Sequence, residues 1–398
     1  MPRENIVVGL EVGTSKVCAV VADMKRDGTI QILGVGEAPS RGVRKGEIVD
    51  IDTCGKCIRE ALADAEEKSD VMIKNVYLGI TGAHIQSFNN RGSFTLPEER
   101  DKVDEEDFAR VQEAARTAPI PAQNMFLHTI LQHYYVDGQD GILNPVGLHG
   151  HKVEADFHII HGVANRVRNS IQCLCDLDIE IEDIVFTPYA AAQAVLDQSQ
   201  KNIGALMVDI GGGTSGYILY TGGAVKQSGV IGIGGDHITN DLSLGLRIPM
   251  GKAEKLKIDE GSCIVGKSIP GESVVLKDEH GFAGREIERE MLNTIINMRV
   301  REMFELLKRE FEKGHYLDYV GAGVVLTGGC SGLRGIKELA EEVFDMPVQL
   351  CRAQNVSGVT SAFENPQYST AIGLVKYAQA TLDDESRGLL DWVKGWFR

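Results

Sequence analysis

Two stretches of this 398-residue chain share a pattern in which an alternating apolar segment leads into an acidic residue, a glycine-rich turn and a second apolar segment. The first copy is NIVVGLEVGTSKVCAVV, residues 5–21, and the second is ALMVDIGGGTSGYILYTGGAV, residues 205–225. Alternation with β-branched residues on both sides of the glycines predicts two strands joined by a tight turn. A chain with two such hairpins, roughly 200 residues apart, is predicted to contain two related halves.

The glycines of the second copy allow two interpretations. They satisfy the pattern GxGxxG through Gly211, Gly213 and Gly216, but a dinucleotide-binding turn requires a helix to begin at its second or third glycine. Residues 217–220 are YILY, which favours a strand. In such a hairpin, successive backbone N–H groups can point into one concavity and hold phosphate oxygens. One copy alone could be a plain flexible turn, whereas two copies favour a phosphate site with Asp209 placed to hold Mg²⁺.

Composition restricts the partners and the compartment. The net charge of −16 disfavours general nucleic-acid binding and requires any contact with an anionic membrane to be local. No run approaches the roughly 18 apolar residues that span a bilayer. Eight cysteines in mostly apolar or helical settings, without a signal peptide before them, predict a reduced, cytoplasmic protein. Metal sites from the CxxC at 54–57, the CxC at 173–175 or the histidines between 149 and 161 are disfavoured by their spacing.

Each glycine-rich hairpin opens a longer pattern of three strands, a helix, a strand and a helix. The chain is long enough for two or more domains. We therefore predict an α/β fold of two lobes, built from duplicated βββαβα cores that each carry an insertion. The predicted boundaries are residues 1–85 and 162–198 for the first lobe, 86–161 for its inserted subdomain, 199–233 and 315–380 for the second lobe, 234–314 for its insertion, 381–387 for a polar linker and 388–398 for a terminal amphipathic helix.

Five segments, in this order, resemble the nucleotide-binding signature of the superfamily of actins, sugar kinases and heat-shock chaperones. The resemblance implies an actin-like two-lobed ATPase fold, with ATP and Mg²⁺ between the lobes and the two hairpins holding the phosphates. The segments are GLEVGTSK (9–16), TPYAAAQAVL (187–196), VDIGGGTSG (208–216), VVLTGGCSGLRG (324–335) and QYSTAIGLVKYA (367–378).

The resemblance also implies the residues of the site, with Glu11 and Asp209 holding Mg²⁺, in part through water. Glu254 and Lys257, three residues apart, would flank the adenine and ribose, although a solvated helical charge pair is an equal alternative. The residues implied in cofactor binding are Glu11, Gly13, Thr14, Ser15, Lys16, Asp209, Gly211, Gly212, Gly213, Thr214, Gly234, Gly235, Glu254, Lys257, Gly328, Gly329 and Ser331.

Catalysis is less well defined by the resemblance. Gln193 matches the position where actins carry a glutamine that positions the attacking water, which implies possible but slow ATP hydrolysis. Glu11 stands where actins and kinases have aspartate, and Gly216 stands where many relatives have a carboxylate. These departures leave the metal geometry and the turnover open, so we expect at most a slow ATPase.

Within this superfamily the sequence is similar to the FtsA family of bacterial division proteins over nearly its whole length. The similarity rests on GLEVGTSKV, SRGVRKGEIVDI, NPVGLHG, TGGAVK and VVLTGGCSGLRGI. It implies a protein that forms filaments on the inner face of the cytoplasmic membrane at the division site, anchors the tubulin-like FtsZ there and binds other division proteins. The inserted subdomain would meet the next protomer. The FtsZ C-terminal tail would dock on the second-lobe insertion, where Arg299 matches a basic position; an ordinary solvated arginine is the alternative.

The end of the chain, RGLLDWVKGWFR, predicts an amphipathic helix. On a helical projection its apolar side chains gather on one face and basic ones lie towards the other. This arrangement suits a helix in the membrane interface, with aromatic rings at headgroup depth and cations facing anionic lipid. A helix docked on the body of the protein is the alternative. The candidate membrane residues are Leu389, Leu390, Trp392, Val393, Lys394, Trp396, Phe397 and Arg398.

Two other functions share the predicted fold. A soluble kinase would need a catalytic aspartate and a sugar pocket between the lobes, and a chaperone would need a substrate domain after residue 380. A PilM-like adaptor of pilus assembly would have the same cleft but would not be expected to carry the amphipathic end.

Overall fold

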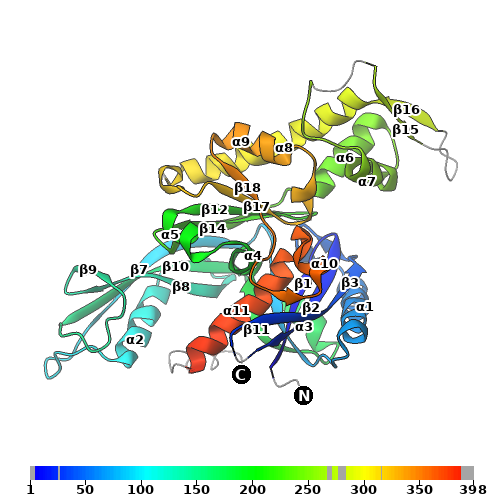
Figure 1. The fold of residues 1–398 in the computed structure, drawn as a ribbon. Coiled ribbons are helices and arrows are strands. Elements are labelled where there is room, and N and C mark those ends of the chain that lie inside the picture. The colour runs from blue at the N-terminus through cyan, green and yellow to red at the C-terminus, as the bar shows by residue number, and fades with distance from the viewer. Residues whose placement is uncertain (1–4, 26, 267–270, 277–283, 315, 387–398) are drawn as a thin grey trace.

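The computed structural model describes residues 5–25, 27–266, 271–276, 284–314 and 316–386. They form two lobes, each built on a sheet, with a smaller subdomain beside the first lobe and a largely helical extension on the second (Figure 1). Within these ranges, no helix is long and apolar enough to cross a bilayer. The predicted helix at 388–398 lies outside the described residues.

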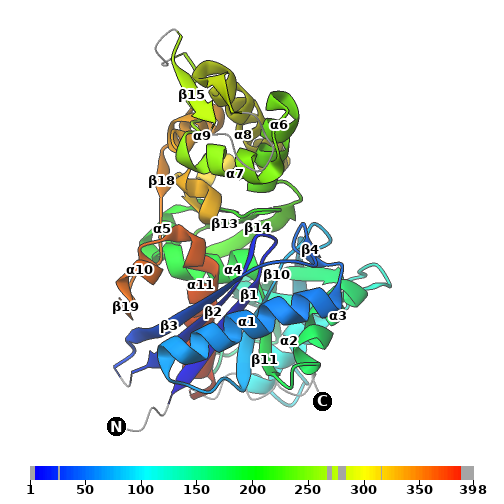
Figure 2. The same ribbon diagram turned by 90° about the vertical axis from the view of Figure 1, so that its right-hand side faces the viewer.

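The first lobe contains a six-stranded sheet in the order β11-β6-β1-β2-β3-β19. The first three strands pair antiparallel, while β6 joins parallel to β1 and β11 joins parallel to β6. Helices α1 (Ile51–Ser69) and α3 (Ala164–Cys175) cover its outer face, and Figure 2 shows α1 lying across the strands. The strands are β1 (Ile6–Val12), β2 (Lys16–Met24), β3 (Ile30–Pro39), β6 (Asn75–Ile80), β11 (Glu180–Phe186) and β19 (Ser357–Gly358).

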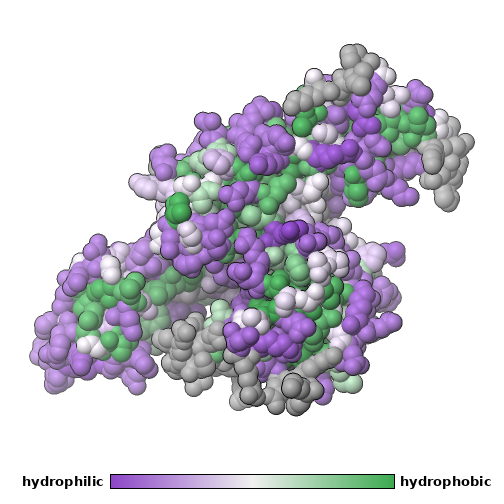
Figure 3. All heavy atoms as spheres, viewed as in Figure 1, coloured by the Kyte–Doolittle hydropathy of each residue, from purple (hydrophilic) through white to green (hydrophobic). Residues whose placement is uncertain are grey.

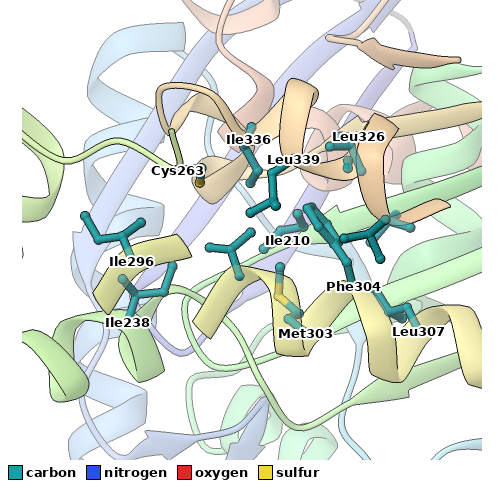
Figure 4. Packing of buried hydrophobic residues seen from close by; sticks show 14 of the residues in the cluster. Ile210, Ile238, Cys263, Ile296, Met303, Phe304, Leu307, Leu326, Ile336 and Leu339 are labelled. Atoms are coloured by element: carbon teal, nitrogen blue, oxygen red, sulfur yellow. The ribbon is translucent and has the colours of Figure 1, made fainter. Parts of the chain in front are cut away.

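The second lobe repeats this topology. Its sheet has the order β14-β13-β12-β17-β18, so that β12 to β14 correspond to β1 to β3, and β17 and β18 correspond to β6 and β11. The predicted duplicated α/β core is therefore confirmed. Helices α8 (Arg289–Glu312) and α9 (Ile336–Phe344) pack their apolar side chains against sheet residues such as Ile210 and Leu326 (Figure 4). The strands are β12 (Ala205–Ile210), β13 (Ser215–Thr221), β14 (Ala224–Ile231), β17 (Val324–Thr327) and β18 (Val348–Leu350).

Two helices lie between the sheets. α4 (Thr187–Val195) and α11 (Ser369–Ser386) share a core with residues of both sheets. Their contact is close because small residues meet there: a side chain on Gly373 would clash with the carbonyl oxygen of Ala190. Residues 381–386, predicted to be a linker, instead continue α11. That segment, TLDDES, contains no glycine or proline to end a helix.

Replacing Gly373 by alanine is expected to lower the free energy of unfolding by roughly 1–3 kcal/mol, because the added methyl group must push the two helices apart. At an unhindered helix position the same change should raise that free energy by up to about 1 kcal/mol, since alanine has the higher helix propensity. Gly55 of α1 is the matched control, because its Cβ would make only an ordinary contact with Cys173 Sγ. Urea unfolding of both variants measures the two effects, and effects of the same sign would contradict the prediction.

The inserted subdomain is a sheet in the order β7-β10-β8-β9 with one helix against it. Strand β7 was not expected, because its sequence QSFNNRGSFT lacks regular apolar alternation. The sheet also contacts β14 of the second lobe, where the buried His158 lies 2.8 Å from Ser228 Oγ through its Nε2 atom. The elements are β7 (Gln86–Thr95), α2 (Glu105–Arg116), β8 (Asn124–Val136), β9 (Gln139–Ile142) and β10 (Lys152–Val163).

The second-lobe insertion forms the far end of that lobe, away from the inserted subdomain (Figure 1). It contains α6 (Gly235–Leu246), α7 (Met250–Asp259), β15 (Ser273–Leu276), β16 (Arg285–Glu288) and most of α8. The long helix α8 begins at Arg289, directly after β16. Among the described residues, the remaining strands and α-helices are β4 (Val43–Arg44), β5 (Glu47–Ile48), α5 (Gln198–Ile203) and α10 (Thr360–Phe363).

Candidate functional site

A cavity of about 450 Å³ opens between the two lobes. Both glycine-rich turns line it, together with carboxylates near the ends of β1 and β12. Apolar side chains from Ile258, Cys330 and Leu333 line it as well. The cavity therefore combines backbone donors, buried acids and an apolar wall, as expected of a site for a charged ligand with an aromatic part.

The two turns have the same backbone geometry. The amide of Gly13 donates to the carbonyl of Lys16, and the amide of Gly211 donates to the carbonyl of Thr214, each over 2.9 Å. Each turn joins two antiparallel strands at the centre of its own sheet. The predicted strand–turn–strand pairs thus occupy equivalent places in the two lobes.

The turns also touch each other across the cavity. A Cβ atom on Gly213 would lie 2.5 Å from Thr14 Oγ1, and one on Gly212 would lie 3.0 Å from Ser15 Cβ. Side chains at the two glycines would therefore force the turns apart. Their absence allows the backbones of both lobes to face one ligand.

The start of α6 is fixed against the second turn. The amide of Gly235 donates to Gly211 O over 2.9 Å, and the amide of Asp236 donates to Gly212 O over 2.8 Å. A Cβ on Gly234 would lie 2.6 Å from both of those carbonyl oxygens. Gly235 lines the cavity. Gly234 does not line it, but its lack of a side chain allows the start of α6 to lie close to the second turn. The positive end of the α6 dipole is thereby held at the turn that is predicted to hold phosphate.

Two shielded carboxylates lie at the centre of the cleft. Burial, reinforced by the charge of Asp209, raises the pKa of Glu11 to about 8, and Glu11 Oε2 has no hydrogen-bond partner in the described structure. Burial also raises the pKa of Asp209, although Thr370 Oγ1 donates to its Oδ2 over 2.6 Å. Gly328, with φ +86°, leaves room for Asp209 that any side chain would fill. A divalent cation would neutralise this repulsion, and carboxylate oxygens are ligands that Mg²⁺ accepts.

The raised pKa of Glu11 predicts how the ligand-free protein responds to pH. The folded state favours the neutral carboxyl, so its contribution to stability is fully present below about pH 4.5 and is lost as the pH rises through about 8. Glu11→Gln stays neutral throughout. In EDTA we compare the unfolding free energy of this variant with that of the unchanged protein at two pH values. We expect the difference, variant minus unchanged protein, to be roughly 2–3 kcal/mol larger near pH 9 than near pH 5. Urea unfolding measures the difference, and parallel pH profiles for the two proteins would contradict it.

Glu254 and Lys257 form an ion pair on α7 in which Lys257 is buried and Glu254 is partly exposed. Lys257, only 8% exposed, donates to Glu254 Oε2 over 2.7 Å, to Thr239 Oγ1 over 2.9 Å and to Gly235 O over 3.1 Å. Thr239 donates to the same carboxylate oxygen. Both Glu254 and Lys257 line the cavity. The network holds Glu254 at the cavity wall, so the alternative of two charges in solvent is wrong for Lys257.

The side chains of two predicted site residues pair with other groups of the protein. Lys16 Nζ pairs with Glu37 Oε1 at 3.0 Å and lies 3.9 Å from the centre of the Tyr368 ring. Ser331 Oγ donates to Gly328 O over 2.7 Å, which stabilises the turn without facing the cavity. Lys16 nevertheless lines the cavity, and its charge partly offsets the rise in the pKa of Glu11.

Gln193, predicted to position the attacking water, bonds to another side chain of the protein, and that role stays a prediction. It is absent from the cavity lining, and its Oε1 accepts a hydrogen bond from Lys201 Nζ over 2.8 Å. Thr187, at the first residue of α4, does line the cavity. Six residues of helix separate the two positions by about 9 Å along the axis.

The structure adds lining residues that the sequence did not single out. Asp236, at the start of α6, bonds to the second turn through its amide, and burial raises the pKa of its carboxyl. Thr370 reaches the site from the start of α11, in a segment matched only as a connecting helix. Thr81 comes from the loop after β6, and Gln367 comes from a short 3-10 helix, Pro366–Tyr368, in the same segment as Thr370. Of these residues, only Asp236 could have been recognised from the sequence, because it directly follows Gly234 and Gly235.

Arg299 lies on α8 of the second-lobe insertion, outside the cavity lining. Its Nε pairs with Asp241 of α6 and its NH1 with Glu302, each at 2.5 Å. Met298 and Leu244 near it are 68% and 69% exposed. The arginine is thus held on a partly apolar surface between α6 and α8. The predicted membrane residues, from Leu389 onwards, lie outside the described residues.

Duplicated sheets with a cavity between two matched turns define the class of actin-like proteins. Solved structures agree with this fold: the PilM–PilN type IV pilus biogenesis complex gives a TM-score of 0.64 at 16% identity, covering 95% of this chain and 99% of that one. MreB5 of Spiroplasma citri bound to AMPPNP gives 0.56 at 14% identity, covering 97% and 99%. The predicted actin-like two-lobed fold is confirmed.

The sequence comparisons identify the family. The family described as "Cell division protein FtsA" matches residues 206–373, and an "SHS2 domain inserted in FTSA" matches residues 82–161. The chain is 37% identical over 392 residues to the cell division protein FtsA of Pseudomonas aeruginosa, covering 98% of this chain and 93% of that protein. It is 34% identical to that of Escherichia coli K12, covering 94% and 90%. The chain belongs to the FtsA family of cell-division proteins.

Proposed function

We propose that the cleft binds ATP together with Mg²⁺. The observation that carries this proposal is the pair of matched turns that meet across a cavity with two shielded carboxylates beneath them. Backbone amides of the turns and the start of α6 would hold the phosphates. Glu11 and Asp209 would hold the metal, in part through water, and the metal would offset the charge of the phosphates. Glu254 and the apolar wall near Cys330 would receive the ribose and the base.

We further propose that ATP serves mainly as an assembly ligand, with at most slow hydrolysis. Gln193, the residue expected to position the attacking water, accepts a hydrogen bond from Lys201 Nζ over 2.8 Å and is not among the residues that line the cavity. Asp236 has a carboxylate at the second turn, and its backbone N–H donates to Gly212 O. The carboxylate itself lies close to Gly212. The site is therefore better suited to binding than to fast turnover.

On this proposal the protein forms filaments at the inner face of the cytoplasmic membrane, where it anchors FtsZ to assemble the division ring. Membership of the FtsA family supports the role in division. The amphipathic sequence 388–398 supports a local, peripheral membrane contact despite the net charge of −16. One such short helix binds weakly, so filaments that present many copies would strengthen attachment.

Co-sedimentation with liposomes tests the membrane contact. The intact protein and a version ending at Ser386 are compared, with and without Mg-ATP, on anionic and neutral vesicles. We expect the intact protein to sediment with anionic vesicles and the shortened version to stay in solution. Equal behaviour of the two would favour a soluble actin-fold ATPase or a PilM-like adaptor, the alternatives that share this fold.

The surface between α6 and α8 is the proposed dock for the FtsZ tail. Arg299 offers a charge there, beside the exposed Met298 and Leu244. We expect Arg299→Glu to weaken binding of a synthetic FtsZ C-terminal peptide about tenfold in fluorescence anisotropy. Arg301→Glu is the matched control, because Arg301 lies on the same helix but pairs with Glu342 of α9. Equal losses in the two variants would place the dock elsewhere.

The inserted subdomain is the proposed contact with the next protomer. Its loop before β10 exposes apolar side chains, with Leu143 at 95% exposure and Val146 and Leu148 above one third. Figure 3 shows hydrophobic surface over this subdomain, well away from the cleft. Apolar surface of this kind commonly marks an interaction site.

A further inference from the structure

A small hairpin stands between the two lobes. Strands β4 and β5 are joined by a two-residue turn, Lys45 and Gly46, with φ angles of 51° and 76°. Such turns need left-handed backbone at both positions, which glycine adopts easily and lysine does not. Figure 2 shows β4 at the edge of the first lobe that faces the second. A lysine at this position of the turn is therefore held there against its backbone preference.

The tip of the hairpin is fixed to the first phosphate turn. The amide of Gly46 donates to Thr14 Oγ1 over 2.9 Å. A Cβ on Gly46 would lie 2.6 Å from Thr81 Cγ2, so the tip also packs on Thr81. Thr14 and Thr81 both line the cavity. The Cα atom of Lys45 therefore lies one peptide unit from the phosphate end of the cleft.

The side chain of Lys45 reaches the second lobe. A Cβ placed on Gly232 would lie 3.4 Å from Lys45 Cδ and 3.8 Å from Lys45 Nζ. Burial lowers the pKa of His237, and the charge of Lys45 lowers it further, which places the ammonium near the start of α6. His237 Nδ1 accepts from the amide of Gly234. One lysine from the first lobe thus contacts the segment of the second lobe that leads into α6, the helix whose first residues bond to the second phosphate turn.

The charges around the cleft leave Lys45 free. Lys16 is paired with Glu37, and Lys257 is paired with Glu254. Lys45 is exposed and has no ion pair among the described residues. The cavity itself is lined by the carboxylates of Glu11, Asp209, Asp236 and Glu254. A polyphosphate entering this acidic cleft would meet one unpaired ammonium at the junction of the lobes.

We propose that the ammonium of Lys45 binds the terminal phosphate of a nucleoside triphosphate in the cleft and so favours the triphosphate over the diphosphate. This inference rests on the nucleotide site proposed above. The flexible four-carbon stem of lysine allows the ammonium to move from Gly232 to the turns without moving the hairpin. Because Lys45 also touches the second lobe, a bound terminal phosphate would join the lobes through one side chain.

Isothermal titration with Mg²⁺ and either a non-hydrolysable ATP analogue or ADP tests the proposal. We expect Lys45→Ala to weaken binding of the ATP analogue roughly tenfold and that of ADP less than twofold, as for loss of one charged hydrogen bond. Lys45→Gly, which suits the left-handed turn, should give the same result and excludes misfolding of the hairpin as the cause. Arg44→Ala is the matched control, because it removes the same charge from an exposed position of the same hairpin.

Each outcome of this titration decides the matter. Selective loss for the ATP analogue in both Lys45 variants, with Arg44→Ala unchanged, would support the proposal. Equal weakening of both nucleotides, or no weakening, would overturn it while leaving the nucleotide site intact. Equal selective loss in Arg44→Ala would assign the effect to general charge and overturn it as well. Failure of the unchanged protein to bind either nucleotide would overturn the nucleotide site, and this inference with it.

Discussion

Asp209→Asn is expected to weaken Mg²⁺-dependent ATP binding roughly 100-fold while the protein stays folded. The carboxylate of Asp209 lies beside Gly328 and accepts a hydrogen bond from Thr370. It is close enough to Glu11 for its charge to raise the pKa of Glu11. An amide keeps the size and one acceptor oxygen but loses the charge that holds a hard cation. The variant should therefore lose the metal-dependent part of binding first.

Isothermal titration in Mg²⁺ and in EDTA separates that part from the rest. Asp183→Asn is the matched control: Asp183 is another largely buried carboxylate with a raised pKa, and it accepts from Tyr377 Oη over 2.8 Å outside the cleft. It should lower stability slightly and leave nucleotide affinity within twofold. If Asp209→Asn binds ATP as tightly as the unchanged protein does, both in Mg²⁺ and in EDTA, the metal site lies elsewhere.

Phe304→Ala is expected to lower the free energy of unfolding by about 3–5 kcal/mol, the usual cost of emptying an aromatic position in a core. Phe304 is fully buried on α8, and its ring lies 5.5 Å from that of Phe344 on α9. Figure 4 shows it among side chains from α8, α9 and the second sheet. The loss should be large because α8, α9 and the second sheet would all face the empty space left by the ring. None of them can move into that space without losing another contact.

Urea unfolding measures this loss, and Met298→Ala provides the comparison. Met298 lies on the same helix but is 68% exposed, so its truncation should change the free energy by no more than about 0.5 kcal/mol. Similar values for the two variants would show that α8 does not pack as described. A large loss for Phe304→Ala should also weaken nucleotide binding, because α8 supports the strands that end at the second turn.

Several parts of the site could be predicted because they depend on neighbouring residues. The alternation in residues 5–21 and 205–225 specifies strands, and the glycines between them allow the tight turns that the structure shows at Gly13 and Gly211. Finding the same pattern twice predicted two related lobes. Strand β7 escaped prediction because its asparagines, glycine and arginine do not alternate with apolar residues, and only pairing with β10 makes it a strand.

The sequence by itself determined the duplicated strand–turn–strand units, the acidic residues beside them and the amphipathic end, because each follows from the order of residues a few positions apart. Only the tertiary structure decided which side chains meet. Thr370 reaches Asp209 across 161 positions, Lys45 touches Gly232 in the other lobe, and Gln193 bonds to Lys201. These contacts depend on sheet order and on how α4 and α11 cross, and such long-range packing leaves no periodic pattern in the residues that form it.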